Sequence, residues 1–168
     1  MKKKKKLNKV IVVVTGLCMC AISTLSVSAA TVAILDWHLV GEDKHIDWTG
    51  NSEYLTEFVD GTEIWNNYKP DVIREATEDM SVELTVSDFS EVSAAVGVTS
   101  SRGTIKFNSY YMNDYSNVQK TNVCAHELGH ALGLDHNQEG DLMYAVVADV
   151  ITLSENDKAS YDASYARY

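Results

Sequence analysis

The sequence predicts an α/β (α+β) fold in which a mixed sheet packs against helices. Short segments with β-branched or alternating apolar residues, typical of strands, lie in the first two thirds of the chain. An apolar helical face interrupts them, and two further segments follow, each opened by a serine that can cap a helix. The order strand, helix, strands, helix, turn, helix is typical of one sheet covered by helices.

Four segments are predicted to be strands, because their apolar residues are β-branched or alternate with polar ones. They are residues 31–39, 80–87, 94–99 and 104–108. The alternation is clearest in 80–87, where Met80, Val82, Leu84 and Val86 would share one face.

Three segments are predicted to be helices. Ser52 can cap the first, residues 53–68, which Lys69-Pro70 would close. One face of this helix would hold Leu55, Phe58, Val59, Thr62 and Trp65. Ser116 can cap a second, long helix that enters the histidine-rich part of the chain. Ser154 and Asp157 resemble a capping box that opens the third helix, from residue 155 to about 165.

The histidine-rich segment reads H-E-x-x-H-x-x-G-x-x-H from His126 to His136. His126 and His130 are four residues apart, so both lie on one face of a helix and can bind one ion. Gly133 can end the helix in a conformation that disfavours side chains, and the turn can bring His136 back as a third ligand. Three neutral nitrogens leave one tetrahedral position of Zn²⁺ open, as in catalytic sites.

Glu127 lies about 100° around the helix from His126. Its carboxylate can therefore reach a water on the metal without binding the metal. Zinc would lower the pKa of that water and polarise a carbonyl group, while Glu127 acts first as general base and then as general acid. The sequence thus predicts a hydrolytic site with Glu127 as its catalytic residue.

Residues 1–29 are predicted to be a signal peptide. Six lysines precede an apolar run over 10–25, and Val27-Ser28-Ala29 supplies a cleavage site. An uncleaved anchor is the alternative, which the short and interrupted apolar run disfavours. Cleavage would leave residues 30–168 as one catalytic domain, secreted and extracellular.

The mature chain would carry eight basic and twenty-four acidic side chains, a formal net charge of −16. Such a surface disfavours nucleic acid and anionic membranes as partners. Nothing in the sequence supports an oligomer, so we expect a monomer. Of three cysteines, Cys124 alone would remain, about 200° around the helix from His126. A buried thiol is expected there; a zinc ligand or a regulatory thiol is the alternative.

The histidine motif, followed by Asp141-Leu142-Met143-Tyr144, resembles the metzincin clan of zinc peptidases and, within it, the matrixins. The resemblance implies a zincin-like fold with a methionine turn, in which Met143 forms an apolar floor beneath the three histidines. It also implies an edge strand whose main chain pairs with a protein or peptide substrate. Our candidates for that contact are Ala94, Ala95, Val96, Gly97 and Val98.

The chain departs from the family pattern at several points. Residues 99–103 are short and hold no histidine for a second, structural zinc, and whether Ca²⁺ is required stays open. His38 and His45 lie far upstream, where we expect structural roles. The family's cysteine-bearing propeptide is missing, and Ala145 replaces the proline that often follows Met-Tyr.

The sequence therefore predicts a secreted zinc-dependent endopeptidase. A zinc-binding or adhesion protein on an inactive peptidase scaffold is the alternative, although the intact Glu127 argues against it. Among peptidases, broad cleavage of unfolded protein and narrow processing of one partner both stay open.

Overall fold

A computed structural model describes residues 29–168. The predicted signal peptide therefore lies, apart from Ala29, outside the described residues. None of the helices in 29–168 combines the length and the apolar character needed to span a bilayer.

A five-stranded mixed sheet forms one layer of the molecule, in the order β2-β1-β3-β5-β4. The strands are β1 (Ile46–Gly50), β2 (Ile73–Glu75), β3 (Leu84–Phe89), β4 (Gly97–Ser100) and β5 (Thr104–Asn108). β1, β2, β3 and β5 are parallel, and β4 alone runs antiparallel to its neighbour β5, with Thr99 opposite Ile105. β4 is therefore an edge strand.

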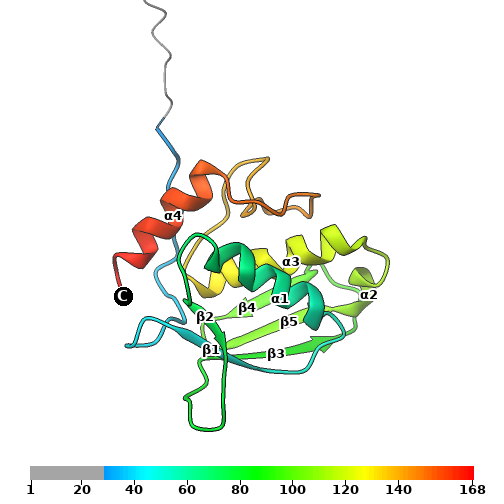
Figure 1. Cartoon of the computed structure of the whole chain (residues 1–168). Helices are drawn as coiled ribbons and strands as arrows, with labels where there is room; N and C mark the ends of the chain where they lie inside the picture. The colour runs from blue at the N-terminus through cyan, green and yellow to red at the C-terminus, as the bar shows by residue number, and fades with distance from the viewer. Residues whose placement is uncertain (1–28) are drawn as a thin grey trace, which may run out of the picture.

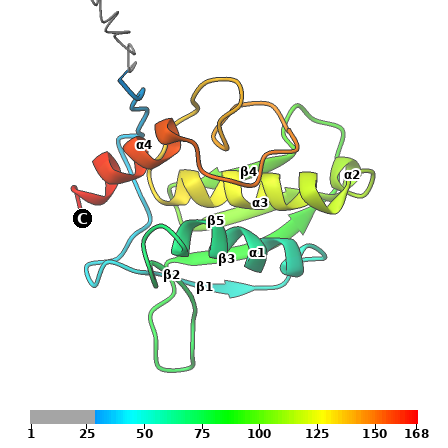
Figure 2. The same ribbon diagram turned by 45° about the horizontal axis from the view of Figure 1, so that its top comes forward.

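Helices form the second layer. They are α1 (Leu55–Asn66), α2 (Ser109–Met112), α3 (Asn117–Ala131) and α4 (Glu155–Tyr165). α1 and α3 lie side by side over the sheet (Figures 1 and 2). Gly61 permits this close approach, because a Cβ there would lie 3.0 Å from the amide nitrogen of Ala125.

The core lies between these layers. Leu84, Val86, Ile105 and Phe107 are buried, as the alternation of β3 and β5 requires. Phe58 of α1 packs edge-on against Trp48, with ring centroids 4.9 Å apart, and against Phe107 at 6.2 Å. The mixed α/β character predicted from the sequence is confirmed.

Several boundaries agree with the prediction. β5 spans the predicted residues 104–108, and α4 spans the predicted 155–165. Ser116 and Ser154 both cap their helices in full capping boxes, with Gln119 and Asp157 as the reciprocal residues.

The predicted strand over 31–39 is wrong. The segment forms a single bridge, between Ile34 and Leu134, and does not join the sheet. The amide of Leu35 donates to the carbonyl of Gly133 and that of Leu39 to Ala131, so the segment runs along the end of α3. These amides find their hydrogen-bond acceptors at the end of α3 and need no partner strand. The β-branched residues of this segment therefore did not predict membership of the sheet.

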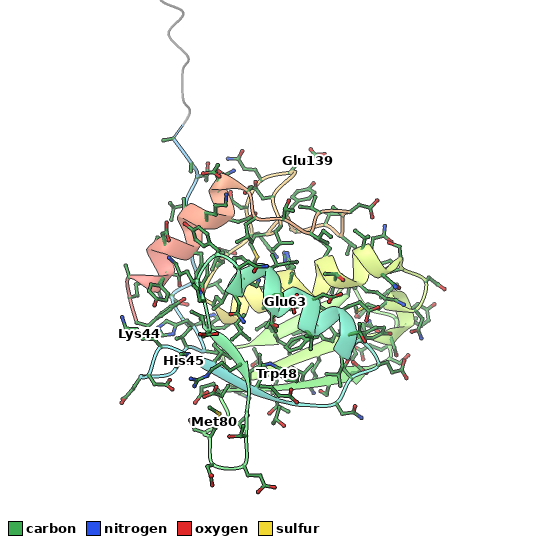
Figure 3. The ribbon with its side chains drawn as sticks, in the orientation of Figure 1. Lys44, His45, Trp48, Glu63, Met80 and Glu139 are labelled. Carbon is green, nitrogen blue, oxygen red and sulfur yellow. The ribbon has the colours of Figure 1, made fainter. Side chains whose placement is uncertain are left out.

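Two predicted strands begin later than expected. β3 begins at Leu84, where pairing with Trp48 starts. Met80 and Val82 are exposed in the loop between β2 and β3, and Figure 3 labels Met80 there. β4 begins at Gly97 rather than at residue 94. The alternation of residues 80–83 and the apolar run of residues 94–96 extend beyond the strands, into segments that form no sheet ladder.

The first helix is shorter than predicted, and its cap differs. Tyr54 is the N-cap residue, and Ser52 instead accepts from the Tyr54 amide and donates to Asp88. Val59 is 41% exposed rather than on the buried face. β1 and β2 were not predicted at all. The polar Asp47 within β1 obscures its pattern, and Arg74 of β2 pairs with that buried carboxylate at 2.7 Å.

Candidate metal centre

α3 and the turn after it bring three histidines together. His126 and His130 lie on α3, and Gly133 adopts φ +89°, which ends the helix. A Cβ at Gly133 would also lie 2.5 Å from the Ser164 hydroxyl of α4. The turn returns His136 to the other two rings.

The three rings converge on one point. One ring nitrogen from each lies within 4.8 Å of those of the other two. The ring centroids are 4.8 Å apart for His126 and His130, 5.1 Å for His126 and His136, and 4.9 Å for His130 and His136. Within residues 29–168 this is the one group of three or more potential metal-binding side chains.

Main-chain carbonyls orient two of the rings. The Nδ1 of His126 donates to the carbonyl of Leu142 at 3.1 Å, and that of His130 to Leu134 at 2.8 Å. A carbonyl can only accept, so Nδ1 carries the proton in both rings and Nε2 keeps its lone pair. This is the arrangement in which imidazoles bind a metal.

Burial keeps the imidazoles of His126 and His130 neutral. Burial, with a smaller contribution from the neighbouring His130, lowers the pKa of His126 to about 3. Burial also lowers the pKa of His130. Neutral nitrogens in this geometry suit Zn²⁺, which prefers imidazole ligands and tetrahedral coordination, so the residues present fit that ion.

α4 supports the loop that holds His126. The Asp157 carboxylate, fully buried, accepts from the amides of Leu142 and Met143 at 2.9 and 3.1 Å. Leu142 in turn accepts from His126. The buried Met143 packs its sulfur against Gly129 of α3, where a Cβ would collide with it. A hydrogen bond from His126 to Leu142 and the packing of Met143 on Gly129 thus hold the loop against α3.

Glu127 is a residue of α3, and its side chain points toward the edge strand β4. Its side chain is buried, and one carboxylate oxygen, Oε2, accepts from the Thr99 hydroxyl at 2.6 Å. Burial raises the pKa of Glu127 to about 7, against the opposing effect of the Thr99 hydrogen bonds. A carboxyl with this pKa can both take up and release a proton near neutral pH.

A cavity of about 220 Å³ opens beside Glu127, His126 and His136. Of the predicted substrate-binding residues, Ala94, Ala95, Val96 and Gly97 line it. Val98 does not line it; this side chain is 43% exposed. The other lining residues are Asn122, Val123, His126, Glu127, His136, Tyr144, Ala145 and Val147.

Thr99 and Asn122 are site residues that no local sequence pattern marks. Asn122 lies one turn before His126, and its side-chain amide bonds to the main chain of Ala148 and Val150, which holds the far wall of the cavity. Thr99 is 28 residues from Glu127. Neither contact belongs to a local pattern.

The remaining histidines and the cysteine lie outside this centre. His38 packs against Tyr168, with ring centroids 4.6 Å apart, and His45 bonds to the Asp71 carbonyl. Cys124 is fully buried on α3, and burial raises the pKa of its thiol.

Comparison with known proteins identifies a family for this chain. No curated protein gives a significant match to the chain. One solved structure with a similar shape is described as "GM1 bound form of the ECX AB5 holotoxin", at 14% identity and a TM-score of 0.46, covering 82% of this chain and 78% of the other. That likeness is too low to bear on the argument. The matrixin family of peptidases matches over residues 43–166. The chain belongs to the matrixin family.

Proposed function

We propose that this matrixin is an exported zinc-dependent endopeptidase. One observation carries the proposal: three imidazoles converge on one point, and two of them, His126 and His136, line the same cavity as the Glu127 carboxyl, next to an edge strand. A purely structural zinc site has no use for a buried carboxyl that binds no metal.

His126, His130 and His136 would hold the zinc ion. When bound, zinc supplies Lewis acidity, which activates water and polarises the carbonyl of the scissile bond. Glu127 takes the proton of the attacking water and delivers it to the leaving amine. Its pKa of about 7 suits both roles at neutral pH.

The edge strand would position the substrate. β4 has one side unpaired within the described sheet, so its main chain and that of residues 94–96 can pair with an extended peptide. Ala94, Ala95, Val96 and Gly97 line the cavity, and with Val98 they stay our candidates for this contact. The cavity lies beside Val123 and Val147, which favours an apolar substrate side chain.

Met143 would form the apolar floor of the centre, and Gly133 would set the turn that returns His136. The predicted signal peptide supports export, and the acidic mature chain favours solubility outside the cell.

Cleavage of unfolded casein by the purified protein tests this function. The variants are Glu127→Ala and, as a matched control, Glu139→Ala, an exposed carboxylate on the loop after α3 (Figure 3). We expect the wild type and Glu139→Ala to release peptides. Glu127→Ala and o-phenanthroline should abolish release, and added Zn²⁺ should restore it in the chelated wild type.

Three outcomes would change this conclusion. Equal turnover by Glu127→Ala would refute the role of Glu127. One zinc per chain without any turnover would favour a zinc-binding or adhesion role on an inactive scaffold. A single discrete cut in one protein, with casein untouched, would indicate a narrow processing enzyme.

A further inference from the structure

The Thr99 hydroxyl is placed to control Glu127. It is the one side-chain hydrogen-bond partner of Glu127 within residues 29–168. Its Oγ1 lies 2.6 Å from Oε2 of the carboxylate and 3.0 Å from the main-chain carbonyl of the same residue. The shorter distance is typical of a hydroxyl that donates to an ionised carboxylate.

The strand places this hydroxyl next to the cavity. Thr99 and Gly97 are two residues apart on β4, so both face α3. A Cβ at Gly97 would come within 2.6 Å of Oε1, the second carboxylate oxygen of Glu127. Oε1 therefore lies directly over the main chain of Gly97. Gly97 and Glu127 both line the cavity. Thr99 holds one oxygen, and the other is left for reaction.

We infer that Thr99 is the positioning residue of the general base, which holds Oε2 so that Oε1 faces the substrate. This inference rests on the proposed function. A hydroxyl has one hydrogen and two lone pairs. When the carboxylate is ionised, Thr99 donates to Oε2. When Glu127 has taken the proton on Oε1, Oε2 is the carbonyl oxygen of the neutral acid and still accepts from Thr99. The pair stays hydrogen-bonded throughout the proton transfer.

Three variants test this role. Thr99→Val replaces the hydroxyl with a methyl group, and Thr99→Ser retains the hydroxyl. Thr85→Val is the matched control, because Thr85 is an exposed threonine of β3, two strands away from β4. The measurements are kcat and KM on a peptide spanning one casein cleavage site, zinc content, and the midpoint of thermal unfolding.

We expect Thr99→Val to lower kcat by about 10- to 100-fold, the loss typical of a hydrogen bond to a charged group. KM and zinc content should stay close to wild type, since the hydrogen bonds of the hydroxyl go to Glu127 alone. The unfolding midpoint should fall only slightly, because the buried Glu127 side chain loses one hydrogen bond. Thr99→Ser should recover most of the wild-type kcat, and Thr85→Val should match the wild type. Wild-type kcat in Thr99→Val, or equal loss in Thr99→Ser, would overturn the inference.

Crystal structures give a readout that does not depend on activity. In the wild type the Glu127 carboxylate should occupy one position over Gly97, and in Thr99→Val it should be displaced or divided between positions. Thr99→Ala serves if Thr99→Val does not fold. An unmoved carboxylate would overturn the role of Thr99, whereas full activity of Glu127→Ala would overturn the proposed function itself.

Discussion

The side of α3 that faces α1 is held by close packing, whereas the side that carries the histidines is held by hydrogen bonds to main-chain groups. On the first side, Gly61 lets the main chain of Ala125 approach α1 so closely that a Cβ at Gly61 would lie 3.0 Å from the Ala125 amide nitrogen. On the second, carbonyls of the following loop orient His126 and His130.

The two kinds of contact have different effects: one places α3 in the fold, and the other orients its histidine rings. Packing is nondirectional and places the helix against the sheet and α1. Hydrogen bonds are directional and set which nitrogen of each ring faces the centre. Substitutions on the packed side should therefore reduce stability, and those on the histidine side should reduce metal binding and activity.

The largest effect should follow removal of a histidine. His136→Ala deletes one nitrogen of the centre, so activity should be lost. Zinc affinity should fall by more than the roughly 100-fold that loss of an outer hydrogen-bond partner can cost. His136 is exposed, so the unfolding free energy of the zinc-free protein should barely change. Zinc titration measures the affinity, with His45→Ala as control. Full zinc affinity in His136→Ala would contradict the assignment of metal binding to the histidine side.

The packed core between α1 and the sheet should show the opposite behaviour. Phe58→Ala removes a fully buried ring from the contacts with Trp48 and Phe107. It should lower the unfolding free energy by about 3–5 kcal/mol, because a cavity remains. Val59→Ala, at the next and exposed position, should cost less than about 1 kcal/mol. Urea unfolding measures both. The folded fraction of Phe58→Ala should still bind zinc; if it does not, packing and orientation are not separable.

Asp157 joins the two kinds of contact and should show both effects at moderate size. Asp157→Asn weakens the hydrogen bonds to the Leu142 and Met143 amides, so the carbonyl that orients His126 should lose its fixed position. We expect stability to fall by about 1–3 kcal/mol and zinc affinity to fall by about 10- to 100-fold. Asp162→Asn, an exposed aspartate of the same helix, is the control. An equal loss of zinc affinity in both variants would contradict this account.

The smallest effect should come from the surface pair of Lys69 and Asp162, which touches neither side of α3. The hydrogen bond from Lys69, aided by Tyr68, lowers the pKa of Asp162. A pKa lowered in the folded state stabilises the fold above the ordinary pKa of aspartate, and the contribution is lost as pH falls through the lowered value.

Stability measured from pH 7 to pH 2 on the wild type and Asp162→Asn tests this pair. The difference between them should be below about 1 kcal/mol at neutral pH, because the pair is solvent-exposed. It should shrink toward zero in acid. A difference that grows as pH falls would show the opposite sign of the shift.

The sequence by itself determined the features that depend on local spacing. The repeat of 3.6 residues per turn places His126 and His130 on one face of α3, and a capping box needs two residues three positions apart, as at Ser116 and Ser154. Gly133 marked the end of the helix, since a positive φ disfavours other residues. Each of these signals lies within a few residues of its effect.

Only the tertiary structure decided which segments join the sheet and what surrounds the site. Residues 31–39 had the composition of a strand but bond to the end of α3. β1 and β2 pair in the sheet although their apolar pattern is weaker than that of residues 31–39. Thr99 reaches Glu127 across 28 residues of chain. Strand pairing and side-chain contacts of this kind depend on partners distant in sequence, and no local periodicity specifies a distant partner.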